Sequence, residues 1–423
     1  MRILVLSKEA WRDEQNGGNV LSNLFAGMDA EFAQIYCNER EPNNNICRKY
    51  YQITDRGMLY SITKRIKAGK ELNYKEAPHE SVVGVESFSG YRRWFGNLLQ
   101  IMREMVWWLG KWDEAAISQF IRDFNPDLIF APCYGNHYMH NLTILAKKVA
   151  GVNVISYISD DFYSNKQVRF SPSYWINHYF LRIHTRKVFK CYSLVYTMTE
   201  EQKDQCEKSF GANMKVLCKT GKFDEDLSKK TVNSPIRFIY AGGIYLNRWK
   251  TLSILAQEIR KMNASGKVMQ LDIYTANPMT DKMSSILDDK MNSFVHPVVP
   301  IAELKDIYLK SDVALHCESF DLRNRLDVRL SFSTKIVDCL DSGCAVMAIC
   351  DSKQAGFAYL KRYNAAICVS SRKEIHDALI EINRDPSLLI SYQKRAFELG
   401  RRNHNEAVVR DMLLKDFTQY AKR

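Results

Sequence analysis

The sequence predicts an α/β fold of two domains, each built on a parallel β-sheet with helices on both faces. The chain has 423 residues, more than one hydrophobic core usually supports. Short apolar runs alternate with longer helical patterns along most of its length, which favours parallel strands joined by helices. A polar stretch from Thr220 to Pro235 interrupts the alternation, and a fresh apolar run begins at Ile236. We therefore place the boundary between the domains in that stretch.

The expected strands are short, apolar and bounded by polar residues. In the first half they lie near residues 3–6, 32–37, 127–131, 152–158 and 194–198. In the second half they lie near residues 236–240, 269–274, 312–316, 345–349 and 365–369. The polar region from 42 to about 90 is expected to be an irregular insertion. The expected domains are residues 1–221 and 222–395, followed by a C-terminal helix over 396–423.

Composition and cysteine usage indicate a folded protein of a reducing compartment. Hydrophobic residues make up 46% and charged residues 26% of the chain, which excludes a disordered polymer. The apolar run from Met1 to Leu6 stops at Ser7, too early for a signal peptide, and no apolar stretch reaches the roughly 20 residues of a membrane span. Eleven cysteines without a C-x-x-C pair lie in apolar runs, as buried free thiols do. We expect a cytoplasmic protein.

The formal net charge of +12 indicates an anionic partner, which can be nucleic acid, a membrane surface or a phosphorylated substrate. No zinc finger, RNA-recognition signature or dense basic tail is found. Nucleic acid is therefore the weakest of the three, and we expect no nucleic-acid partner.

The most informative segment runs from Leu330 to Val346. Ser333 is a good helix N-cap, a glycine follows the helix, and a buried strand comes next. A helix start carries free N–H groups and a positive dipole end, so it attracts anions such as pyrophosphate. Lys335 stands in the first turn, where a cation opposes the dipole, and this favours an anion bound nearby.

The order of strand, Ser333-Thr334-Lys335, the acidic Asp338 one turn on, and a small-Gly-x-x-Val ending resembles the donor-binding element of GT-B sugar transferases, especially bacterial polysaccharide enzymes. The resemblance implies two Rossmann-like domains facing a central cleft. It also implies that the helix start holds the donor diphosphate and that Asp338 holds the ribose hydroxyls. An ordinary capped helix with an exposed lysine is the alternative.

Two departures from this family pattern affect the acidic residues. Many relatives carry glutamate where Asp338 stands, and a second glutamate eight residues earlier, at the position of Leu330. Glu318, just after the strand that ends at His316, is a candidate substitute for that second carboxylate.

Two glycine pairs resemble the loops that these enzymes turn towards the cleft. Gly242-Gly243 follows the first strand of the second half, and the resemblance implies a nearby arginine and lysine that neutralise the leaving diphosphate. Arg248 and Lys250 are the candidates, and Arg248 is preferred because a guanidinium binds phosphate bidentately. The weaker pair, Gly17-Gly18, follows the first strand of the chain, where glycine lets the backbone approach a ligand closely.

Candidate catalytic residues follow strands of the first half. Asp160 and Asp161 come after the strand near residues 152–158, and one of them can hold the acceptor or act as a base. His137 and His140 follow the strand that ends at Ala131, and His137 is preferred as a contact to the sugar or acceptor. Helix capping is the alternative for the aspartates and a structural role for the histidines. No pattern of metal ligands is found, so we expect no metal ion.

A basic aromatic helix is expected between Tyr91 and Trp112. Its apolar positions recur at steps of three and four, and Arg92, Arg93 and Arg103 lie around them. It is either a core helix or a helix that lies on an anionic membrane.

Together these patterns predict a glycosyltransferase that needs no cofactor and takes a nucleotide diphosphate-sugar as co-substrate. The acceptor is expected to be a glycan or a lipid-linked glycan, with peripheral contact at the inner face of a membrane. A nucleotide-sugar 2-epimerase of the same fold and a non-catalytic nucleotide-sugar-binding subunit are the alternatives.

Overall fold

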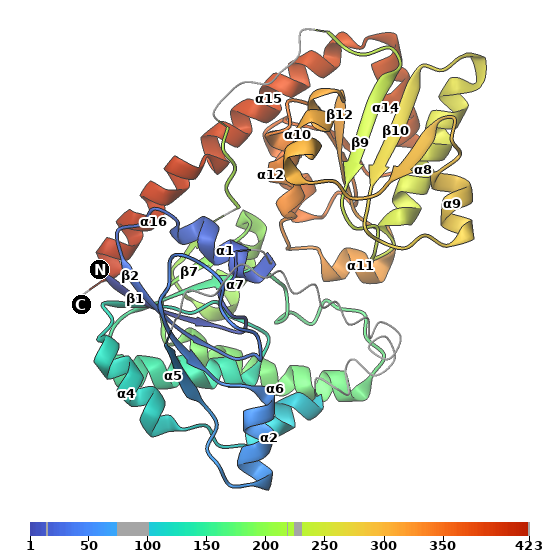
Figure 1. The fold of residues 1–423 in the computed structure, drawn as a ribbon. Helices are drawn as coiled ribbons and strands as arrows, with labels where there is room; N and C mark the ends of the chain where they lie inside the picture. Colours follow the sequence, from blue (N-terminus) through green and yellow to red (C-terminus); the bar gives the residue numbers. More distant parts are fainter. Residues whose placement is uncertain (14–15, 74–100, 218, 224–230, 422–423) are drawn as a thin grey trace.

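The protein is seen in a computed structural model that describes residues 1–13, 16–73, 101–217, 219–223 and 231–421, with the backbone alone for 16–20. Its strands form two separate sheets, each flanked by helices (Figure 1). The predicted α/β class with two parallel-sheet domains is confirmed.

The first sheet has the order β4-β3-β2-β1-β5-β6-β7-β8, and its strands pair in parallel except for β3 with β4. The strands are β1 (Arg2–Ser7), β2 (Glu31–Tyr36), β3 (Lys49–Gln52), β4 (Lys70–Asn73), β5 (Leu128–Phe130), β6 (Val154–Ile158), β7 (Tyr192–Thr197) and β8 (Met214–Val216). The helices between them are α1 (Asn16–Phe25), α2 (Asp55–Thr63), α4 (Glu114–Phe124), α5 (His137–Ala150), α6 (Pro172–Phe189) and α7 (Glu200–Phe210). A further helical segment covers 101–109.

Residues of β1 show why this sheet is covered on both faces. Successive side chains of a strand point to opposite faces. Leu4 and Leu6 pack in one hydrophobic cluster, whereas Ile3 and Val5 pack in another. All four are completely buried, so the continuous apolar run reflects a strand with helices on either side.

The prediction of an irregular insertion from 42 to about 90 is wrong for the part that the structure describes. Residues of β3, α2 and β4 extend the sheet there, and Tyr50 and Tyr51 of β3 are buried. The polar composition hid these elements, because β3 and β4 are four-residue strands at the sheet edge with few apolar side chains. Residues 74–90 lie outside the described residues.

The second sheet has the order β11-β10-β9-β12-β13-β14, and all its strand pairs are parallel. Its strands are β9 (Ile236–Ala241), β10 (Met269–Tyr274), β11 (Ser293–His296), β12 (Val313–Cys317), β13 (Ala345–Ile349) and β14 (Ile367–Val369). Its helices are α8 (Arg248–Met262), α9 (Asp281–Leu287), α10 (Ile301–Leu309), α11 (Leu322–Asp327), α12 (Thr334–Leu340), α13 (Ala355–Arg362) and α14 (Arg372–Arg384).

The last two helices, α15 (Ser387–His404) and α16 (Glu406–Tyr420), carry the chain from the second sheet back to the first (Figure 1). Phe417 of α16 packs against Phe25 and Phe130 of the first sheet's core. Beside this return, the His404 carbonyl accepts a hydrogen bond from Gly221 N at 2.8 Å. The two passages of the chain between the sheets are therefore bonded to each other.

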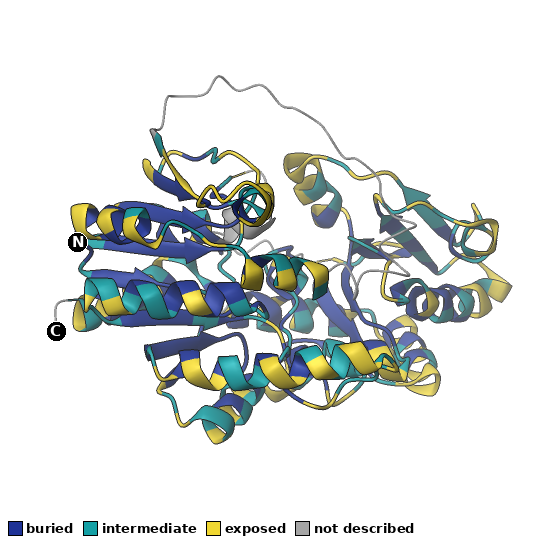
Figure 2. Cartoon of the chain, turned by 90° about the horizontal axis from the view of Figure 1, so that it is seen from below, coloured by how far each residue is buried: buried dark blue, intermediate teal, exposed yellow. Residues whose placement is uncertain are grey.

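The burial map of the same fold agrees with these layers, since the strands are buried and the helices expose only their outer faces (Figure 2). The ten cysteines within the described ranges are free thiols, and all except Cys191 and Cys368 are buried. In the part of the chain that the structure describes, no helix is long and apolar enough to cross a membrane.

The expected basic aromatic helix is only partly seen, because Tyr91, Arg92 and Arg93 lie outside the described residues. Within 101–109, Trp107 is buried and stacks on Tyr138 of α5, with ring centroids 4.1 Å apart. Arg103 donates from Nε to Asp55 Oδ1 at 2.8 Å. One side of this helix thus packs in the core, and Arg103 is paired with Asp55.

Candidate active site

Each sheet has one point at which its strand order changes direction. In the first sheet this point lies between β1 and β5, and in the second between β9 and β12. Open parallel sheets bind ligands at the carboxyl ends of the strands next to such a point. The residues that follow these strands are therefore where a site is expected.

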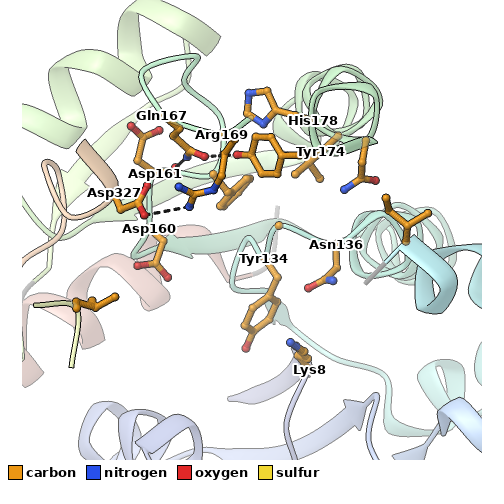
Figure 3. A pocket seen from close by; sticks show the side chains of 16 residues that line it. Lys8, Tyr134, Asn136, Asp160, Asp161, Gln167, Arg169, Tyr174, His178 and Asp327 are labelled. Atoms are coloured by element: carbon orange, nitrogen blue, oxygen red, sulfur yellow. Dashed lines mark hydrogen bonds and ion pairs between the residues drawn. The ribbon is translucent and has the colours of Figure 1, made fainter. Parts of the chain in front are cut away.

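A cavity of about 490 Å³ opens at the first of these points (Figure 3). Lys8 follows β1, Tyr134 follows β5 and Asp160 follows β6, and all three line it. Helix α6 contributes Tyr174, Asn177, His178 and Leu181. The second domain contributes Leu246 and Asp327. The cavity thus lies between the two domains.

Asp160 and Asp161, adjacent in sequence, have different environments. Asp160 is exposed and lines the cavity, and within the described residues its side chain bonds only to Ser159 Oγ, at 3.2 Å. Figure 3 shows it extending into the space between the Arg169–Asp327 pair and Tyr134. Asp161 is buried and accepts from Ser164 N at 2.9 Å and from Arg329 Nη2 at 2.9 Å. Asp160 is therefore the carboxylate available to a substrate.

The run from Asp327 to Leu330 joins the second domain to the first. Asp327 Oδ2 accepts from Arg169 Nη2 at 3.0 Å. The Leu330 carbonyl accepts from Thr199 Oγ1 at 3.2 Å. Together with the bond from Arg329 to Asp161, these contacts hold the segment that leads directly to Ser333.

The histidines expected near the acceptor lie behind the cavity wall. His137 is the first residue of α5, and its Nε2 lies 3.2 Å from Asn177 Oδ1. Its two neighbours Asn136 and Asn177 line the cavity, whereas His137 does not. His140 is buried, with Nε2 2.8 Å from the Tyr134 carbonyl, and burial lowers its pKa to about 3. His140 is thus neutral and supports the turn that carries Tyr134.

At the second point, Gly242 brings the β9–α8 loop against Lys335. Gly242 has φ +145°, and a Cβ added to it would lie 2.2 Å from Lys335 Nζ. The backbone angle there favours glycine, and any side chain would have to displace the end of Lys335. Gly243 lies next to it, and its carbonyl accepts from the Tyr240 hydroxyl at 2.6 Å.

Lys335 is a half-buried cation that forms no ion pair in the described part of the chain. Its Nζ donates to the Tyr240 hydroxyl at 3.0 Å and lies 4.7 Å from the centroid of that ring. Burial, and then the nearby charge of Arg248, lower the pKa of Lys335 below its ordinary value. A partly desolvated ammonium that lacks a counter-ion favours an anionic ligand.

Arg248 and Glu318, two other candidate donor residues, bind each other. Arg248 donates from Nε and Nη2 to the two Glu318 oxygens, at 2.7 and 2.8 Å, and both side chains are buried. Burial alone would lower the pKa of Arg248, but the hydrogen bond and charge of Glu318 outweigh it and raise that pKa. The bidentate edge of Arg248 is therefore occupied by a carboxylate. The charges of both residues act on Lys335, and no local sequence pattern indicates that Arg248 and Glu318 bind each other.

Between Gly243 and Arg248 the loop turns sharply at two non-glycine residues in the left-handed region, Leu246 with φ 55° and Asn247 with φ 61°. The side chain of Asn324 donates to the Leu246 carbonyl at 2.9 Å and so holds the turn. Such backbone strain is retained where structure or function requires it. Here the strained turn places Leu246 of the second domain in the wall of the cavity between the domains.

The start of α12 lies beside Lys335. Ser333 is its N-cap, but its side chain accepts no capping hydrogen bond, and Thr334 is exposed. Asp338 is exposed one turn on, and its Oδ1 accepts from Lys219 Nζ at 2.5 Å.

The remaining candidates lie apart from these groups or add little to them. Lys250 is exposed, with Nζ 5.9 Å from the Trp249 ring centroid. Gly17 and Gly18 belong to the first turn of α1. Among the described residues, no group of three or more acidic, histidine or cysteine side chains could hold a metal ion.

Sequence reasoning missed most of the cavity wall, namely Lys8, Tyr134, Asn136, Arg169, Tyr174 and Asn177. Two of these could have been found, since Lys8 and Tyr134 directly follow predicted strands. Arg169 and Tyr174 lie in and after a loop whose path depends on the fold of the whole domain.

No family model matches the chain, and no curated protein matches its sequence. Solved structures match over nearly its whole length. Sucrose-phosphate synthase from Thermosynechococcus elongatus is 10% identical, with a TM-score of 0.63 over 99% of this chain and 98% of its own. HepE from Anabaena in complex with UDP is 11% identical, with a TM-score of 0.61 over 99% and 100%. The trehalose-6-phosphate protein from E. coli bound with UDP-2-fluoro glucose is 11% identical, with a TM-score of 0.60 over 100% of both chains. These likenesses confirm the GT-B fold.

Proposed function

We propose that this protein is a glycosyltransferase that moves a sugar from a nucleoside diphosphate sugar to a hydroxyl of an acceptor held in the cavity. The observation that carries the proposal is Lys335, a half-buried ammonium that forms no ion pair with the described residues and is held against the Gly242 backbone at the carboxyl end of β9. A diphosphate supplies the missing negative charge. The free N–H groups at the start of α12 add to the same positive potential.

The leaving group of this reaction carries its new negative charge on phosphate oxygens. Lys335 and the helix N–H groups are fixed before the reaction begins, so they stabilise that charge without reorganisation. Arg248 contributes less than its charge suggests, because Glu318 neutralises it. In this proposal the cations of the chain do the work without a divalent metal, and exhaustive chelation should leave turnover intact.

The acceptor in this proposal is a glycan or a lipid-linked glycan. Its hydroxyl would enter the cavity, where Asp160 is the carboxylate free to orient it or take its proton. Lys8, Tyr134 and Asn177 offer further polar contacts around it. Leu246 links the donor site to the cavity, because it lies in the same loop as Gly242 and lines the cavity wall.

The proposal is tested first by ligand binding. Nucleotides and nucleotide sugars are screened by the rise in melting temperature, beginning with UDP compounds because HepE and the E. coli protein were solved with them. A ligand at a hundred times its Kd stabilises the native state by about 2.7 kcal/mol. Lys335→Ala should abolish the rise, whereas Lys282→Ala, which removes an exposed lysine of the same domain, should keep it.

If the wild-type protein binds no nucleoside diphosphate or its sugars, the donor site is wrong. Conversion of the donor sugar without any acceptor would instead identify a nucleotide-sugar epimerase. Binding without turnover on any acceptor would identify a nucleotide-sugar-binding subunit.

A further inference from the structure

Helix α2 and the helix over 101–109 form one packed unit on the outside of the first domain. Asp55 of α2 accepts from Arg103 Nε at 2.8 Å and from Trp107 Nε1 at 2.6 Å. Ser61 Oγ accepts from Lys111 N at 2.8 Å. Figure 1 shows the two helices side by side at the end of the domain away from the second sheet, next to α6.

The outer side of this unit carries large apolar side chains in water. Trp108 is 81% exposed and Ile66 is 62% exposed. We call the whole set the outer apolar surface; it consists of Leu59, Ile62, Ile66, Met105, Trp108 and Leu109. Figure 2 views the molecule from this end, and the outward helix faces there are exposed. Exposed apolar groups gathered on packed elements mark an interaction surface.

The outer apolar surface is bordered by an excess of positive charge. From Asp55 to Glu71 the chain has five basic and two acidic residues. Asp55 is paired with Arg103, and Lys67 Nζ lies 3.6 Å from Asp113 Oδ1. Arg56, Lys64 and Arg65 are exposed. Lys64 Nζ lies 4.2 Å from the ring centroid of Tyr60, so its charge is held beside the apolar side chains.

We propose that the outer apolar surface docks on an anionic lipid bilayer, with Trp108 at the level of the headgroups. Apolar and aromatic side chains bordered by lysine and arginine suit the boundary between headgroups and acyl chains, where long basic side chains reach the phosphates. A second copy of this chain would bring the same basic border against itself. Like charges then repel, so charge complementarity favours the lipid surface over self-association.

The docking surface adjoins the cavity. Ile101 begins the described part of the 101–109 helix and lines the cavity with Asn177 and Leu181 of α6. A bilayer at the outer apolar surface would therefore lie along the helix that ends at the acceptor site. The docking itself depends only on the surface and holds even where the reaction differs from the one proposed.

The test is co-sedimentation of the full-length protein with vesicles at low salt. One set contains phosphatidylcholine with phosphatidylglycerol and the other phosphatidylcholine alone. The variant replaces Lys64, Arg65 and Lys67 with glutamine, and its matched control replaces Lys282, Lys305 and Lys310, exposed lysines of the second domain. Both variants lose the same positive charge. A difference in vesicle binding between them therefore depends on where the charges lie and not on the net charge.

The wild-type protein should sediment with the anionic vesicles and not with the neutral ones. The surface triple variant should bind about a hundredfold more weakly, and the control triple should bind nearly as the wild type. Trp108→Ala should also weaken binding while the melting temperature stays unchanged. In the wild type, the Trp108-dependent part of the tryptophan emission should shift to the blue on anionic vesicles.

Three results would overturn the proposal. The first is that the wild-type protein fails to sediment with anionic vesicles, and the second is that both triple variants lose binding equally. The third is concentration-dependent dimerisation in sedimentation velocity that Trp108→Ala abolishes, since this assigns the surface to a second copy of the chain.

Discussion

Arg329 of the second domain donates from Nη2 to Oδ2 of Asp161 in the first domain, at 2.9 Å. Both side chains are largely removed from water, with 17% and 3% of their areas exposed. A second ion pair, from Arg169 to Asp327, crosses the boundary in the opposite sense. The two pairs lie in the run that leads to Ser333, so contacts with the first domain position the start of α12.

Asp161→Ala should destabilise the protein more than it impairs the chemistry. It leaves the largely buried Arg329 without its carboxylate partner and with only the neutral Gln205 Oε1, at 3.0 Å, as an acceptor. The loss of such a charged partner typically costs about 3 kcal/mol. Urea unfolding followed by fluorescence measures the loss, with Asp160→Ala as the matched control because that carboxylate is exposed. Equal midpoints for the two variants would show that the cross-domain pair contributes nothing.

Asp160→Asn should have the opposite profile. Its unfolding free energy should stay within about 0.5 kcal/mol of the wild type, as for most surface positions. If it orients the acceptor hydroxyl or takes its proton, kcat/KM for the acceptor falls by about a hundredfold or more. An Asp160→Asn enzyme with unchanged kinetics would remove this residue from the mechanism.

The contrast between these neighbours shows what sequence alone can predict. Most strands of both cores were predictable, because runs such as Ala345–Ile349 are apolar on both faces. The short strands β3, β4, β8 and β11 were not predicted. The position of Lys335 at a helix start followed from the order of residues around it. The pairings of Asp161 with Arg329 and of Glu318 with Arg248 join residues 168 and 70 positions apart. No local pattern encodes such distant partners, so the sequence could not tell a free carboxylate from an occupied one.

Gly242→Ala should remove nucleotide binding through Lys335. The new Cβ would lie 2.2 Å from the ammonium and force it away. Gly266→Ala is the matched control, because Gly266 has φ +147° but no atom within 4 Å of its would-be Cβ. Both variants place alanine at a backbone angle that disfavours it. A difference in donor affinity between them, measured by calorimetric titration, therefore reports the displacement of Lys335. Comparable donor affinities in the two variants would show that the contact of Gly242 with Lys335 is not needed for donor binding.

The pH dependence of kcat/KM should report Lys335. Its pKa is lowered by burial and then by Arg248, and only the ammonium form neutralises the diphosphate. Activity should therefore fall as pH rises through a value below the ordinary lysine pKa of about 10.4. In Lys335→Arg, the residual activity should lose this alkaline limb, because a guanidinium stays charged. An alkaline limb that persists unchanged in this variant belongs to another group.

In the proposed reaction, each sugar transferred releases one nucleoside diphosphate, and Lys335 stabilises its departure. The direct measurement is the number of nucleoside diphosphate molecules released per acceptor molecule glycosylated, for the wild type, Lys335→Met and Lys282→Met. We expect a ratio of one in the wild type and in Lys282→Met. In Lys335→Met we expect a rate lowered by about a hundredfold, because one charge-stabilising group is lost. Diphosphate release without glycosylated acceptor, or equal rates in the two lysine variants, would contradict the proposed reaction.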